Sequence, residues 1–140
     1  MKAKTPSKLE KILAAGHLGV TSECGPPRGS DPEVIKEKAN LIKDYVDAIN
    51  ITDNQTSVVR LCSLASCIRI KQMGLEPVLQ MVTRDRNRIA LQSDLLGANE
   101  ADVRAILALT GDPAKISDQK EAKGVFEGDS TFLLDIISND

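Results

Sequence analysis

Polar side chains stand at the ends of three apolar, strand-like runs, and these residues are the ones whose types and spacing are suited to chemistry. The three segments are Ser22-Glu23-Cys24-Gly25-Pro26-Pro27-Arg28-Gly29, Ala48-Ile49-Asn50-Ile51-Thr52-Asp53-Asn54 and Ile106-Leu107-Ala108-Leu109-Thr110-Gly111-Asp112. A fourth polar segment covers residues 80–85. A βα barrel builds its active site from the carboxyl ends of several strands. Four such ends therefore predict that acidic, amide and hydroxyl groups converge on one pocket.

The residue types give less support to nucleophilic catalysis or to a metal site. His17 is the only histidine, and no spacing around it indicates a Ser-His-Asp arrangement. Cys24 directly follows Glu23, but no histidine or second cysteine stands nearby to activate it or to complete a metal site. We therefore predict no metal. Three cysteines without framework spacing favour a reducing compartment, and we expect Cys62 and Cys67 to be buried thiols.

Charge and hydropathy exclude several classes of protein. The chain has 140 residues and a formal net charge of −2, so it carries no basic surface for nucleic acid or anionic lipid. Its apolar runs fall far short of the ~20 residues of a membrane helix. Residues 1–6 are basic but lack the apolar stretch of a secretory signal. We expect a cytoplasmic protein.

The periodicity predicts a single domain over residues 1–140 in which strands and helices alternate. Strands are expected at about 19–23, 48–52, 77–81 and 105–109. Helices are expected at 8–15, from Pro32 to about Tyr45, at 57–73, at 86–96 where Gly97 should end the helix, and at 130–138. Four charged residues open the helix at 86–96 or precede it, namely Arg84, Asp85, Arg86 and Arg88, and we expect them to form a solvated face.

Alternating strands and helices indicate a parallel sheet, either doubly wound or singly wound as in a barrel. Two-residue alternation places polar sets on common faces of the strands. These sets are Thr21 with Glu23, Asn50 with Thr52, Val78 with Gln80, and Ala108 with Thr110 and Asp112. A barrel can point polar groups inward, whereas a doubly wound sheet covers both faces with apolar helices. The predicted fold is therefore α/β, with four singly wound βα units forming half of a TIM-type (βα)8 barrel and helices on the outer face.

At these residues the chain resembles the methylenetetrahydrofolate reductase family. Four segments carry the resemblance: Glu23 with the Gly25-Pro26-Pro27-Arg28-Gly29 turn, Asn50-Ile51-Thr52-Asp53-Asn54, residues 76–88, and Leu107-Ala108-Leu109-Thr110-Gly111-Asp112. The resemblance implies a cytoplasmic flavoprotein with noncovalent FAD and NAD(P)H or a partner subunit as electron donor. It would be an oxidoreductase that reduces 5,10-methylenetetrahydrofolate to 5-methyltetrahydrofolate, in one-carbon metabolism and methionine biosynthesis.

The resemblance also implies roles for individual residues. Glu23 matches the general acid that protonates a ring nitrogen of the folate, and Asp112 matches the aspartate between flavin and pterin, so both are catalytic candidates. The candidates for flavin binding are Thr52, Gln80, Thr110, Gly111, Asp112 and Asp129. Gln80 stands where better-known members of the family carry histidine.

The chain matches only four of the eight strands of such a barrel. The alternative function is therefore a non-catalytic half-barrel that binds flavin or pterin weakly or assembles with a partner chain. Four singly wound units leave one face of the sheet and both outer strands uncovered. We expect a second copy of the chain or a partner subunit to cover them.

Overall fold

Helices and strands alternate through residues 7–139, the part of the chain that the computed structural model describes. The short helix α1 (Lys8–Ala14) comes first, with the Ser7 side chain accepting the Glu10 N–H at its start. The strands are β1 (Thr21–Cys24), β2 (Ala48–Ile51), β3 (Pro77–Val82) and β4 (Ala105–Leu109). The helices that follow them are α2 (Glu33–Ile42), α3 (Ser63–Gln72), α4 (Arg88–Glu100) and α5 (Ser130–Asn139). Residues 1–6, on which the expected lack of a secretory signal depends, lie outside the described residues.

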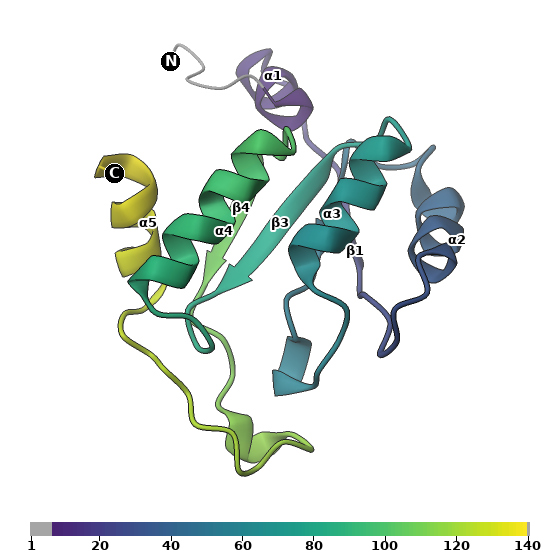
Figure 1. Ribbon diagram of the computed structural model, residues 1–140. Helices are drawn as coiled ribbons and strands as arrows, with labels where there is room; N and C mark the ends of the chain where they lie inside the picture. The colour runs from purple at the N-terminus through teal and green to yellow at the C-terminus, as the bar shows by residue number, and fades with distance from the viewer. Residues whose placement is uncertain (1–6, 140) are drawn as a thin grey trace.

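The four strands form one parallel sheet in the order β1-β2-β3-β4. Strand order equals chain order, so each connection moves one strand along in the same direction. The predicted singly wound α/β sheet is confirmed. Helices α2 to α5 pack on one side of it (Figure 1).

The hydrophobic core lies between the sheet and these helices. From the sheet it receives alternate residues of the central strands, Ile49 and Ile51 from β2 and Leu79 and Met81 from β3. The helices contribute Ile35, Ala39, Cys67, Ile70, Leu91, Ala98, Leu133 and Ile136. Because successive strand residues point to opposite faces, the residues that alternate with these, such as Asn50, Val78 and Gln80, face the side without helices.

One predicted face is wrong. We placed Ala108 with the polar residues of the open face, but the register pairs Gln80 with Leu107 and Val82 with Leu109. Leu107 and Leu109 therefore share the face of Glu23 and Gln80, while Ala108 packs against the core. The prediction fails because β4 ends at Leu109 and the segment beyond it, which carries Thr110 and Asp112, does not keep the two-residue period.

Two helices also differ from expectation. The single helix predicted at 57–73 is a 3-10 turn, η1 (Gln55–Ser57), followed by an extended stretch and then α3. Helix α4 does not end at Gly97 but runs on to Glu100. The Leu64 side chain lies 3.5 Å from the position of a Cβ on Gly97, so tertiary packing against α3 lets a helix-breaking residue stay inside the helix.

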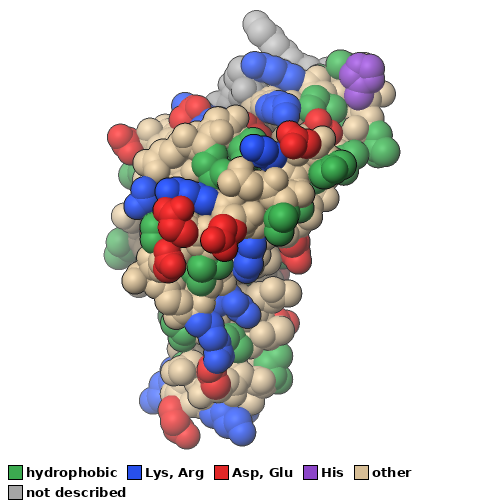
Figure 2. All heavy atoms as spheres, turned by 90° about the vertical axis from the view of Figure 1, so that its right-hand side faces the viewer, with side chains coloured by type: hydrophobic (Ala, Val, Ile, Leu, Met, Phe, Trp, Pro, Cys, Tyr) green, Lys and Arg blue, Asp and Glu red, His purple; other side chains and the backbone are tan. Residues whose placement is uncertain are grey.

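Surface charges are mixed in sign. Figure 2 shows the side of the molecule that carries α2, on which acidic and basic side chains alternate rather than gather into a patch of one sign. Within residues 7–139, no helix has both the length and the hydropathy to cross a membrane.

Candidate active site

A cavity of about 280 Å³ opens at the carboxyl ends of the strands. Its wall includes residues from the ends of all four strands, among them Glu23 near the end of β1, Asp53 after β2, Arg84 after β3 and Asp112 after β4. The remaining wall residues are Thr52, Asn54, Gln55, Thr56, Gln80, Val82, Leu109 and Gly111. Small-molecule sites start at roughly 300 Å³, so the cavity suits one fused ring system rather than a whole dinucleotide. The four strand ends therefore converge on one pocket, as predicted.

Glu23 and Gln80 meet across the open face of the sheet. The Gln80 amide donates a hydrogen bond from Nε2 to Glu23 Oε1 at 3.2 Å. Gln80 is buried on the central strand β3, whereas Glu23 is exposed on the edge strand β1. The amide therefore holds an exposed carboxyl group against the cavity wall.

Thr52 presents a hydroxyl group that has no partner. Its side chain is buried, and Oγ1 makes no hydrogen bond in the structure, although Thr52 is one of the residues of the cavity wall. Buried hydroxyl groups are nearly always hydrogen-bonded, since an unmade bond costs about 1–3 kcal/mol. An orphaned hydroxyl at a cavity wall thus marks a place where a ligand with hydrogen-bonding groups would fit.

Gly111 and Asp112 form the turn that closes the cavity on the β4 side. Gly111 has a φ of +92°, a conformation that favours glycine, and a Cβ there would lie 3.1 Å from the Val82 Cβ and 3.2 Å from the Arg84 Cβ. The exposed Asp112 side chain follows at the cavity wall. The turn therefore brings a carboxylate from one edge of the sheet toward the cavity that Glu23 reaches from the other.

A buried ion pair includes Asp53 of the cavity wall. Asp53 accepts hydrogen bonds from Arg86 Nη1 at 2.7 Å and from the Val82 N–H at 3.0 Å, and its side chain is 1% exposed. Arg86 also contacts Asp94 of α4 at 2.8 Å. Burial opposes the charge of Arg86, but attraction to Asp53 and hydrogen bonds with Asp53 and Asp94 outweigh it and raise its pKa. The pair joins the end of β2 to the segment after β3.

Arg84 is the site residue that sequence reasoning missed. We predicted a solvated position, yet the side chain is 3% exposed and its guanidinium binds Asp85 and the backbone carbonyls of Asn54 and Asp112. The charges around Arg84 indicated local ion pairs, but no sequence signal shows carbonyl groups from distant loops. Arg86 is likewise largely buried rather than solvated.

Two predicted cofactor residues do not lie on the cavity wall. Thr110 Oγ1 accepts the Ser130 N–H at the start of α5. Asp129 accepts the Thr131 and Phe132 N–H groups and the Thr131 hydroxyl, and these bonds, that of the hydroxyl first, lower its pKa. Asp129 thus lies at the amino end of α5 and Thr110 contacts that end, whereas Glu23, Thr52, Gln80, Gly111 and Asp112 are brought together at the cavity.

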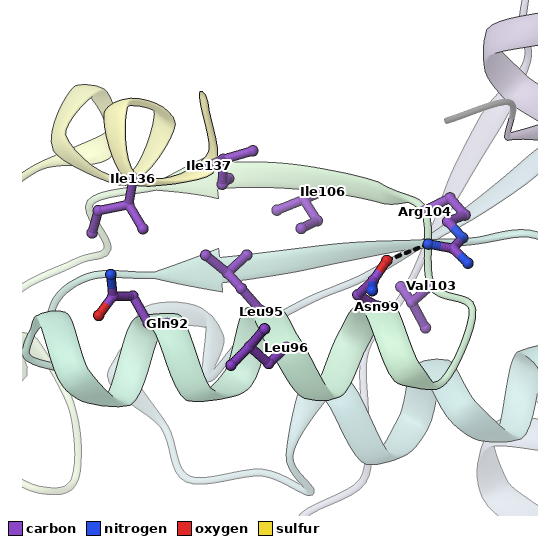
Figure 3. A pocket seen from close by; sticks show the side chains of 9 residues that line it. All are labelled: Gln92, Leu95, Leu96, Asn99, Val103, Arg104, Ile106, Ile136 and Ile137. Atoms are coloured by element: carbon purple, nitrogen blue, oxygen red, sulfur yellow. Dashed lines mark hydrogen bonds between the residues drawn. The ribbon is translucent and has the colours of Figure 1, made fainter. Parts of the chain in front are cut away.

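A second hollow is apolar and lies away from these polar groups. This groove of about 570 Å³ lies between α4, α5 and β4. Figure 3 shows Leu95, Ile106 and Ile136 on its wall and Arg104 at one end. Arg104 pairs with Asp102 and Asn99. The groove is larger than the strand-end cavity but offers no group suited to proton transfer, so the strand ends remain the candidate site.

Comparison with known proteins gives the family. Residues 8–139 match the family model of methylenetetrahydrofolate reductase, which covers nearly the whole chain. The chain belongs to the methylenetetrahydrofolate reductase family. Comparison with curated proteins finds no match.

Membership of the methylenetetrahydrofolate reductase family agrees with the fold, because the family has a TIM barrel and the four parallel βα units are consistent with half of one. It also associates the chain with oxidoreductases of one-carbon folate metabolism, a family that is generally flavin-dependent.

Proposed function

We propose that this chain supplies the first half of a site that reduces 5,10-methylenetetrahydrofolate to 5-methyltetrahydrofolate. One observation carries the proposal. Glu23 and Asp112 come from the two outermost strands, yet both line one cavity together with the unpaired Thr52 hydroxyl. The buried Gln80 amide also holds the Glu23 carboxyl group in place, which a carboxylate that is merely solvated does not require.

Flavin fits the residues present. The Thr52 hydroxyl offers a free hydrogen-bonding group, and the Gly111 backbone borders the cavity without a side chain of its own. Thr52, Gln80 and Gly111 would hold the ring system of FAD, which supplies a hydride when it is bound in reduced form. Thr110 and Asp129 would contribute through the start of α5 rather than through the cavity wall.

The chain's own residues then have distinct tasks. A protonated Glu23 donates its proton to a ring nitrogen of the folate, which opens the five-membered ring and leaves an iminium that accepts hydride at the methylene carbon. Gln80 holds the Glu23 carboxyl group toward the substrate. Asp112 accepts hydrogen bonds from the pterin and keeps it against the hydride source.

The proposal is tested by replacing the acid without changing its shape. The 140-residue chain is loaded with FAD, reduced with dithionite so that no natural electron donor is required, and mixed with methylenetetrahydrofolate while flavin absorbance is followed. We expect Glu23→Gln to retain FAD and to slow reoxidation by about 10²- to 10⁴-fold, the usual contribution of a general acid. Glu100→Gln, at the far end of α4, is the control and should leave the rate unchanged.

Reoxidation of the Glu23→Gln protein at the unsubstituted rate would reject Glu23 as the acid. A chain that binds FAD but never reduces the folate would instead favour a binding module without catalysis.

A further inference from the structure

One guanidinium group connects the carboxyl ends of three neighbouring strands. Arg84 follows β3, donates from Nη1 to the Asp112 carbonyl at 3.0 Å, and donates from Nη2 to the Asn54 carbonyl at 3.4 Å. Asn54 follows β2 and Asp112 follows β4. The Arg84 backbone N–H also donates to the Thr110 carbonyl at 3.0 Å. The turn that carries Asp112 is therefore attached to Arg84 through two separate hydrogen bonds.

A second donor reaches the same carbonyl from the other side. The Ser57 hydroxyl donates to the Asp112 carbonyl at 2.6 Å, across 55 positions in the chain. Ser57 ends η1, and Thr56 and Ser57 within it, together with Asn54 just before it, have positive φ although none is glycine. Such conformations are unfavourable for these residues and persist where the surrounding structure imposes them. The backbone after β2 is thus held in an unfavourable shape that places Ser57 against the Asp112 turn.

Arg84 is not itself arranged to bind an anionic ligand. Its Nε and Nη2 atoms both donate to the Asp85 carboxylate, at 2.9 and 2.7 Å, so the positive charge already has a partner. The remaining donors are directed at carbonyl oxygens of the two neighbouring loops. An arginine with a planar set of donors suits this task, because it can hold several acceptors in a fixed geometry.

We propose that Arg84, assisted by Ser57, is a positioning residue that fixes the Asp112 turn so that the Asp112 carboxylate stays at the cavity wall. The role in folate reduction rests on the function proposed above, whereas the effect on the turn does not. Gly111 supports the assignment, since its α-carbon packs so closely on Arg84 and Val82 that a Cβ would lie within 3.2 Å of both side chains.

The first experiment measures the turn without any ligand. Backbone order parameters of the Gly111 and Asp112 amides are determined by ¹⁵N relaxation for the full chain and for Arg84→Met, Arg84→Lys and Ser57→Ala. We expect values near 0.85 in the unsubstituted chain and below about 0.6 in Arg84→Met. Arg84→Lys and Ser57→Ala should give intermediate values, since each keeps a charged donor at position 84 beside the Asp112 carbonyl, whereas Arg84→Met leaves only the Ser57 hydroxyl on it. Arg104→Met is the matched control, because it removes an ion-paired arginine at the other end of β4 and should leave both amides rigid.

The second experiment uses the FAD-loaded, reduced chain. In Ser57→Ala and Arg84→Lys, the methylenetetrahydrofolate concentration that gives half-maximal reoxidation should rise about tenfold, because a displaced Asp112 carboxylate loses its hydrogen bond with the pterin. The FAD dissociation constant should change little. A general loss of structure would weaken both together.

Rigid Gly111 and Asp112 amides in a folded Arg84→Met protein would overturn the proposal. If Arg84→Met does not fold, the same result in Ser57→Ala and Arg84→Lys overturns it. A full chain that fails to bind FAD rejects the proposed function, and the order parameters still decide the role of Arg84.

Discussion

At the scale of single residues, the site combines exposed carboxylates with buried groups that hold them. Glu23 and Asp112 are exposed, whereas Gln80 and Arg84, which contact a side chain and a backbone carbonyl of those residues, are buried. Exposure lets the carboxylates reach a substrate, and burial of their partners limits how far they move. The residues proposed to act on a ligand thus lie at the surface, and the residues that position those side chains are buried.

The conformation of Gly111 predicts a large effect of a small substitution. Gly111→Ala places a Cβ 3.1 Å from the Val82 Cβ at a φ of +92°, so we expect a loss of about 1–3 kcal/mol in the free energy of unfolding. Gly29→Ala is the control, since Gly29 lacks a positive φ and no described atom lies within 4 Å of its Cβ position. Urea denaturation measures both variants, and equal stabilities would contradict the strained conformation.

The three thiols should differ sharply in reactivity. Burial raises the pKa of Cys24, an effect that Lys38 partly offsets, and burial raises the pKa of Cys67 still further. The prediction of a buried Cys62 is wrong, because this thiol is exposed at the start of α3. Because the thiolate is the reactive form, we expect one rapid thiol when the folded chain is labelled with Ellman's reagent at pH 8. Cys62→Ser should abolish the rapid phase. Rapid labelling of two or more thiols would show that the core is open.

At the scale of elements, the ends of β2 and β3 are joined by the buried pair of Asp53 and Arg86. We expect Asp53→Asn to lower the free energy of unfolding by about 3 kcal/mol, because it leaves a largely buried guanidinium without its main partner. Asp94→Asn is the matched control. Its side chain is 38% exposed, so its ion pair with the same arginine should contribute under about 1 kcal/mol. Similar losses in the two variants, measured by chemical denaturation, would show that burial does not set the strength of the pair.

At the scale of the whole molecule, the sheet has two outer edges. Neither β1 nor β4 has a second neighbouring strand among residues 7–139, and the helices beside them expose apolar side chains, Leu41 on α2 and Leu134 and Ile137 on α5. Unpaired edges of parallel strands tend to pair with further strands. We therefore expect the 140-residue chain to associate with a second copy, β1 of each joining β4 of the other.

Light scattering coupled to size-exclusion chromatography at micromolar concentration tests this association. Leu134→Lys places a charge beside the β4 edge and should shift the population toward the monomer, whereas Ile89→Lys, on the exposed surface of α4, should not. A chain that stays monomeric with a cooperative melt would mean that the open face and edges tolerate solvent.

The sequence by itself determined the order of elements, the winding of the sheet and the strand ends that meet at the site. These depend on local periodicity and on turn residues, and the segments after β1, β2 and β4 could therefore be placed at one cavity with Glu23, Thr52, Gly111 and Asp112 in it. The cytoplasmic location and the electron donor stay predictions, as does the partner that covers the sheet.

Only the tertiary structure decided which groups support the site. Periodicity failed for Ala108 because the alternation does not continue through the turn after Leu109, and it failed at Gly97 because contact with α3 keeps α4 helical. In the local sequence, Arg84 is simply one more charged residue beside Asp85 and Arg86. Its role depends on carbonyl groups 30 and 28 positions away in the chain, which come within reach only when the loops fold onto one another.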